Sequence, residues 1–148
     1  MDRPTREHQR PEGVSDATVE AVDTFTRALE TVEVARGHLL QWHRLTGTGD
    51  TQLREAIDQL RAAGHTDVAD RIERELVGHN VIEGRWTFQV IEEYDDHYTA
   101  TWRELERQTR EELVEGRRHL LEAEMKEANR THGREHHEAV PPSQDQET

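Results

Sequence analysis

Residues 14–45 read VSDATVEAVDTFTRALETVEVARGHLLQWHRL, and the apolar side chains in this stretch recur with the period of an α-helix. Their steps of three, four and seven place them on one face, as in an amphipathic helix that packs against a core. We therefore predict one long helix here, with an inward face made of Val22, Phe25, Leu29, Val32 and Leu39.

Both ends of this first helix carry recognisable signals. Ser15 can accept a hydrogen bond from the first turn, and Val14 and Val19 have the spacing of a hydrophobic staple. The apolar period runs to about Leu45 and stops at residues 47–49, Gly-Thr-Gly, which is typical of a turn. We expect the first helix to end at this turn.

Two short helices are predicted next. The first of them begins at about residue 50 and ends at Gly64, because glycine is common just beyond a helix C-terminus. The second begins at Thr66 or Asp67 and ends at Gly78. Together they form a short helical hairpin.

The last predicted helix is the longest, from about Trp86 to about Asn129. No proline lies between Glu12 and Val140, so no proline interrupts this helix or the others. Steps of three and four again mark one face, which consists of Ile91, Tyr94, Tyr98, Trp102, Leu105, Thr109, Leu113, Gly116 and Leu120.

The predicted fold class is all-α, with two long antiparallel helices and a short helical hairpin between them. This arrangement is bundle-like with coiled-coil packing, and it brings Trp42 close to Trp86 and Phe88 as an aromatic cluster. The last helix outruns the first by roughly 20 Å at 1.5 Å per residue, and its projecting end is apolar. An exposed apolar helix end is usually an interface. We therefore predict a homodimer through Leu113, Leu120, Leu121 and Met125.

The two ends of the chain are polar and contain few large apolar side chains. Residues 1–13 and 131–148 are therefore predicted to be disordered tails. The ordered part is expected to be a single all-helical domain, residues 14–130.

Composition excludes several classes of protein. The chain has 148 residues with 32 Asp and Glu against 19 Lys and Arg, so its net charge of −13 disfavours direct nucleic-acid binding. It has no Cys, and thus no thiolate nucleophile. No apolar run approaches the roughly 20 residues that a membrane-spanning helix needs. We expect a cytoplasmic protein with no membrane insertion.

One set of side chains suggests a metal site. In the antiparallel arrangement His38 falls opposite about Glu93, and Glu93 and His97 are four residues apart on one helix face. Glu33 and His43 lie on the same helix as His38. Imidazoles and carboxylates from facing helices bind divalent transition metals in bundles. The preferred interpretation is the alternative, in which His38 and His43 cap or flank the bundle and the acids face solvent.

The least regular segment is residues 78–86, GHNVIEGRW, and loops of this kind often carry function. Its candidate residues are His79, Asn80, Arg85 and Trp86; the structural alternative is a helix cap followed by a staple. No catalytic or nucleotide-phosphate motif is present. The leading hypothesis is a non-enzymatic assembly or protein-interaction module without a cofactor. The alternative is a bundle that binds a metal or small molecule, including a metalloenzyme, through His38, His43, Glu93 and His97.

Overall fold

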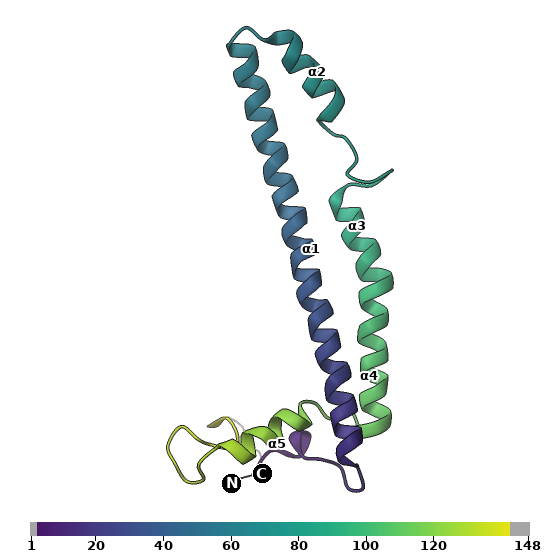
Figure 1. Ribbon diagram of the computed structural model, residues 1–148, viewed down its shortest axis with the longest axis vertical. Helices are drawn as coiled ribbons and strands as arrows, with labels where there is room; N and C mark the ends of the chain where they lie inside the picture. Colours follow the sequence, from purple (N-terminus) through teal and green to yellow (C-terminus); the bar gives the residue numbers. More distant parts are fainter. Residues whose placement is uncertain (1–2, 143–148) are drawn as a thin grey trace. The chain divides into compact units, whose positions relative to one another are not determined.

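The computed structural model describes residues 3–142, and within this range no β-strand is present. The prediction of an all-helical fold is confirmed. No helix of the described part is both long and apolar enough to cross a membrane. In chain order the elements are η1 (Arg6–His8), α1 (Asp16–Ala62), α2 (Thr66–Leu76), α3 (Thr87–Glu93), the π-helical η2 (Tyr94–Thr99), α4 (Ala100–Val114) and α5 (Leu120–Asn129) (Figure 1).

The structure divides into two compact units. The first unit consists of Met1–Thr31 with Thr101–Thr148, and the second unit is Val32–Ala100. Helix α1 contributes residues to both units. Residues 1–2 and 143–148 of the predicted tails lie outside the described residues.

Helix α1 begins as predicted. The backbone N–H of Thr18 donates to the Ser15 hydroxyl at 3.2 Å, which caps the first turn. Val14 packs against the buried cluster that includes Val19, so the staple is present as well.

The predicted turn at residues 47–49 is wrong, because α1 continues without a break to Ala62. Neither Gly47 nor Gly49 adopts a positive φ, and a helical glycine costs only about 1 kcal/mol relative to alanine. The threonines among them fit a helix, since Thr48 and Thr51 donate their hydroxyls to carbonyls four residues earlier. With no proline nearby, these costs do not end the helix.

Replacing both glycines by alanine should therefore stabilise the protein. A Cβ at Gly47 or Gly49 would meet no atom within 4 Å, so neither methyl group clashes. We expect the Gly47→Ala/Gly49→Ala variant to gain about 2 kcal/mol in unfolding free energy, measured by urea denaturation. An unchanged midpoint would show that α1 is interrupted here in solution.

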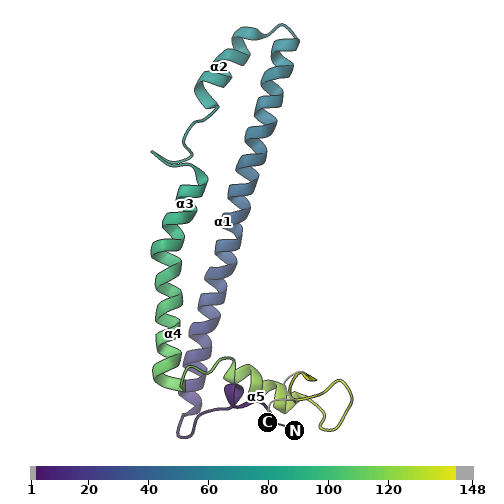
Figure 2. The same ribbon diagram turned by 180° about the vertical axis from the view of Figure 1, so that it is seen from behind.

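A glycine cap ends α1. Gly64 has φ +89°, and the N–H of His65 donates to the carbonyl of Leu60 at 2.9 Å, which is the hydrogen bond of a Schellman motif. Helix α2 then runs back beside the last turns of α1 (Figures 1 and 2). Its start at Thr66 matches the prediction.

Polar contacts and two buried residues hold α2 against α1. Arg61 donates to Asp70 at 3.0 Å and to Glu73 at 2.5 Å. Ile57 and Ala69 are the buried apolar residues of residues 32–100. The second unit therefore has a very small core.

The prediction of one straight helix from Trp86 to Asn129 is also wrong. Helix α4 ends at Val114, and Glu115, Gly116 and His119 have left-handed φ values of 56°, 72° and 55°. Left-handed conformations of non-glycine residues cost roughly 1–2 kcal/mol each. The guanidinium of Arg110 donates to the Gly116 carbonyl at 2.8 Å and stabilises the turn.

The reversal creates the core of the first unit. Val114 is 0% exposed and Leu120 is 6% exposed, and both lie in one cluster with Val19 and Val22. Leu121 packs against this cluster, whereas Leu113 and Met125 are about half exposed. Of the predicted interface residues, some therefore belong to the core and some to the surface. The predicted homodimer was inferred from a projecting end of one long last helix, and that helix is divided into α4 and α5. The dimer itself stays a prediction.

The segment before α1 lies beside α5 (Figure 2). Arg10 donates to both carboxylate oxygens of Glu124 at 2.8 Å and also pairs with Asp16. These hydrogen bonds raise the pKa of Arg10. After α5, the buried Arg130 binds Glu127 at 2.7 Å. The Arg130 guanidinium also donates to the His137 carbonyl at 3.3 Å. Within the described part, residues of both predicted tails therefore make specific contacts with the helices.

The π-helical segment η2 shifts the predicted inward face of the last helix. A π-turn holds one residue more than a regular turn. Tyr98 and Leu105 were expected to face inward and are about half exposed, whereas their neighbours Thr99 and Glu106 are buried.

The aromatic cluster predicted from Trp42, Trp86 and Phe88 is not buried, because Trp86 and Phe88 are 50% and 47% exposed.

Candidate functional site

The second unit contains a cavity of about 530 Å³ between α1 and the segment that connects α2 to α3. This volume lies within the usual range for ligand pockets, about 300–1,000 Å³. We call it the connector pocket. One side of the pocket is a surface of α1, made of Thr46, Gly47, Gly49, Asp50, Leu53 and Arg54. The other side runs from the end of α2 to the start of α3 and is made of Leu76, Gly78, His79, Asn80, Val81, Trp86 and Thr87.

The pocket exists because the connecting segment is not helical. His43 of α1 is hydrogen-bonded to Thr87 at 2.6 Å, at the start of α3, while Arg61 binds α2. Between these two contacts, residues 46–54 of α1 face a loop with a positive φ at Gly78 and at Gly84. The loop fills less space than a helix would.

The pocket is deeper on its α1 side because two of the lining residues there, Gly47 and Gly49, have no side chain. A Cβ placed on Gly47 or Gly49 has nothing within 4 Å. No other helix of the described chain therefore packs closely on these glycines. They leave the α1 backbone accessible and deepen the pocket.

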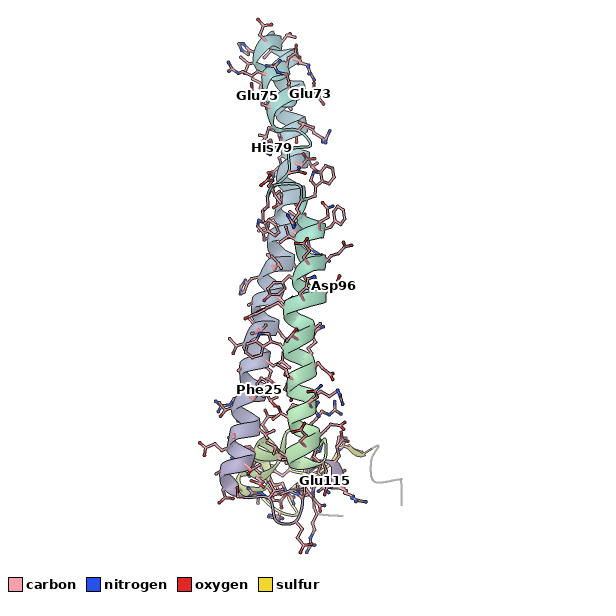
Figure 3. All side chains as sticks on the ribbon, turned by 90° about the vertical axis from the view of Figure 1, so that its right-hand side faces the viewer. Phe25, Glu73, Glu75, His79, Asp96 and Glu115 are labelled. Carbon is pink, nitrogen blue, oxygen red and sulfur yellow. The ribbon has the colours of Figure 1, made fainter. Side chains whose placement is uncertain are left out.

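Most polar groups of the pocket are already satisfied within the protein. Asp50 and Arg54 form an ion pair at 2.9 Å. His79, labelled in Figure 3, donates from Nδ1 to the Asn80 carbonyl at 2.7 Å. The indole N–H of Trp86 donates to the Gly78 carbonyl at 3.4 Å. What remains for a ligand is mainly carbon surface.

Three of the four loop candidates line the pocket: His79, Asn80 and Trp86. Arg85 does not, because it donates to Glu93 at 2.8 Å and to the Glu83 carbonyl at 3.0 Å. Sequence reasoning missed the α1 side. The signal for the α1 side is a pair of glycines, Gly47 and Gly49, within a stretch that is otherwise helical. The same pair is also typical of a turn, which is the prediction made from the sequence.

The predicted metal ligands do not gather in threes at one point of the described chain. Among residues 3–142 no group of three or more His, Asp and Glu side chains is placed to hold a metal ion. Glu93 instead accepts a hydrogen bond from Arg85, which lowers its pKa. His38 and His97 are exposed, and Glu33 is half-buried.

An ion pair lies close to these residues in the sequence. Arg36 of α1 donates to both oxygens of Asp95 in η2, at 2.6 and 2.9 Å. This bidentate pair raises the pKa of Arg36. The neighbouring Asp96 is exposed (Figure 3). The metal site therefore stays a prediction without support from the contacts.

Comparisons with known proteins give no guide to function. No family model, curated protein or solved structure matches the chain. The connector pocket and the surface around it are the features of the described chain that bear on function.

Proposed function

We propose that this protein is a non-enzymatic binding module that takes an apolar group of its ligand into the connector pocket. The observation that carries the proposal is the cavity itself, about 530 Å³ with more apolar than polar surface. Apolar pockets with a few polar groups are the usual form of ligand sites in proteins.

The surroundings of the pocket support the same function. A row of half-exposed apolar side chains follows the end of α2 through the start of α3. Exposed apolar patches often mark interaction sites, and the buried apolar residues of this unit are only Ile57 and Ala69. The residues of this row are Leu76, Val81, Ile82, Trp86 and Phe88.

The ionisable groups of the pocket favour binding over catalysis. They are Asp50, Arg54 and His79. Asp50 and Arg54 neutralise each other, and His79 Nδ1 is held by a backbone carbonyl. General acid–base catalysis requires a donor or acceptor that is placed to exchange a proton with substrate, and a mutually paired Asp and Arg do not provide one.

The test fills the pocket from its α1 side. A neutral polarity-sensitive dye such as Nile red should bind the wild type and gain fluorescence. Gly49→Leu places a side chain on the face shared by Leu53 and should weaken dye binding roughly tenfold, as expected for loss of an apolar site.

Gly37→Leu is the matched control. Gly37 is also inside α1, and a Cβ at this position would also meet no atom within 4 Å, but Gly37 lies outside the pocket. The substitution should leave dye affinity unchanged, and circular dichroism should show both variants folded. Equal dye affinity in the two variants would contradict the proposal.

A further inference from the structure

The connector pocket occupies the place where α1 lacks a helical neighbour. Residues 46–54 lie between the contact of His43 with Thr87 and the contact of Arg61 with α2. Nine residues of helix rise about 13 Å, or two and a half turns. A helical segment of similar length would cover this face.

The shape of the pocket suits the apolar face of such a helix. Its carbon surface comes from both sides, with Leu53 on α1 and Leu76, Val81 and Trp86 opposite. Gly47 and Gly49 allow another backbone to approach α1 closely, because the distance between packed helices depends on the side chains at the contact.

The net charge of the second unit favours a cationic ligand. Residues 32–100 contain thirteen Asp and Glu against seven Arg, a net charge of −6. Arg54, which lines the pocket, is paired with Asp50, and Arg85 of the connecting segment is paired with Glu93. A second copy of the chain, at −13, would be repelled, whereas a cationic segment would be attracted.

We propose that the connector pocket binds the apolar face of a basic amphipathic helix supplied by a partner protein. This inference rests on the proposed function and specifies its ligand. Helices of this kind anchor through apolar residues at positions i, i+3, i+4 and i+7. The exposed Trp86 is the largest side chain available to such an anchor.

The experiment uses the full-length chain and synthetic labelled peptides of about sixteen residues, long enough to form a helix. One peptide has leucines at these positions and lysines elsewhere. A second replaces the lysines by glutamates, and a third replaces the leucines by serines. Fluorescence anisotropy should show the basic peptide binding roughly tenfold or more tightly than the acidic one, with the difference decreasing as salt rises.

The variants test where the peptide binds. Gly49→Leu should weaken the basic peptide roughly tenfold, while Gly37→Leu should not change its affinity. The inference is overturned if the wild type binds the basic peptide and the serine peptide with equal affinity. It is also overturned if Gly49→Leu and Gly37→Leu bind the basic peptide with equal affinity. Dye binding that is lost in Gly49→Leu, without any peptide binding, overturns the partner but preserves the pocket. A wild-type dimer that Gly49→Leu dissociates in sedimentation would show that the occupant is a second copy.

Discussion

Leu120→Ala should lower the free energy of unfolding by about 3 kcal/mol, the middle of the range for a buried leucine. Leu120 is 6% exposed and lies in the cluster with Val19, Val22 and Val114. Its burial depends on the reversal at residues 115–119, so the substitution tests that turn as well as the core. Urea denaturation followed by circular dichroism measures the loss.

Leu113→Ala is the control for this measurement. Leu113 is 47% exposed at the end of α4, and substitutions at such positions usually cost much less than core truncations. We expect a loss of about 0.5 kcal/mol. If Leu113→Ala lowered the free energy of unfolding more than Leu120→Ala, α4 would have to continue straight into α5. Leu113 would then lie on the inward face that the sequence pattern predicts.

Glu106→Ala should lower the free energy of unfolding by about 3–4 kcal/mol, because it breaks a buried ion pair. Glu106 is 6% exposed and accepts hydrogen bonds from Arg110 at 2.7 Å and from Thr26 at 3.0 Å. The substitution leaves the half-buried guanidinium of Arg110 without its carboxylate. The same guanidinium binds the Gly116 carbonyl, so the turn after α4 should loosen too.

An exposed pair on the same helix provides the comparison. Arg107 donates two hydrogen bonds to Glu104, which lowers the pKa of Glu104 to about 2. The stabilisation from a lowered carboxyl pKa is present at neutral pH and is lost as the pH falls toward 2. Solvent screens such pairs, so Glu104→Ala should cost far less at pH 7 than Glu106→Ala. Equal losses at pH 7 would show that Glu106 is exposed in solution.

Much of the fold follows from local signals in the sequence. The Ser15 cap, the glycine beyond the end of α1 and the position of α2 were all predicted from the types of residue present. These signals are reliable because a cap or a left-handed glycine depends on only a few neighbouring residues. The helix continues through residues 47–49 because two glycines without a proline cost too little to end it, whereas the reversal at residues 115–119 depends on the energy of distant contacts.

The prediction that the last helix continues through residues 115–119 fails for a clear physical reason. The sequence supports a helix through Gly116, but a straight helix would not bury both Val114 and Leu120 against Val19 and Val22. Burying a large apolar side chain is worth about 1.5–3 kcal/mol, which offsets the cost of the left-handed residues. Local propensity contains no information about this gain.

The sequence pattern singles out residues on only one side of the connector pocket. His79, Asn80 and Trp86, which line it, belong to an irregular, mixed segment that stands out between helices. The contribution of Gly47 and Gly49 depends on the empty space beside them. That space is set by the path of the connecting segment, which periodicity does not reveal.

The π-helical segment η2 allows the chain to lose one residue without turning the rest of the helix. Its extra residue is what places Glu106 inward and Leu105 outward. Deleting one residue between Tyr94 and Thr99 would convert the segment to a regular helix and leave the later positions of α4 facing as they do now, because the wider turn holds one residue more than a regular turn. A one-residue deletion within the regular turns of α4 would instead rotate every later position by about 100°. In descendants of this sequence, a deletion within η2 would therefore need no compensating changes along α4, whereas a deletion within α4 would need them.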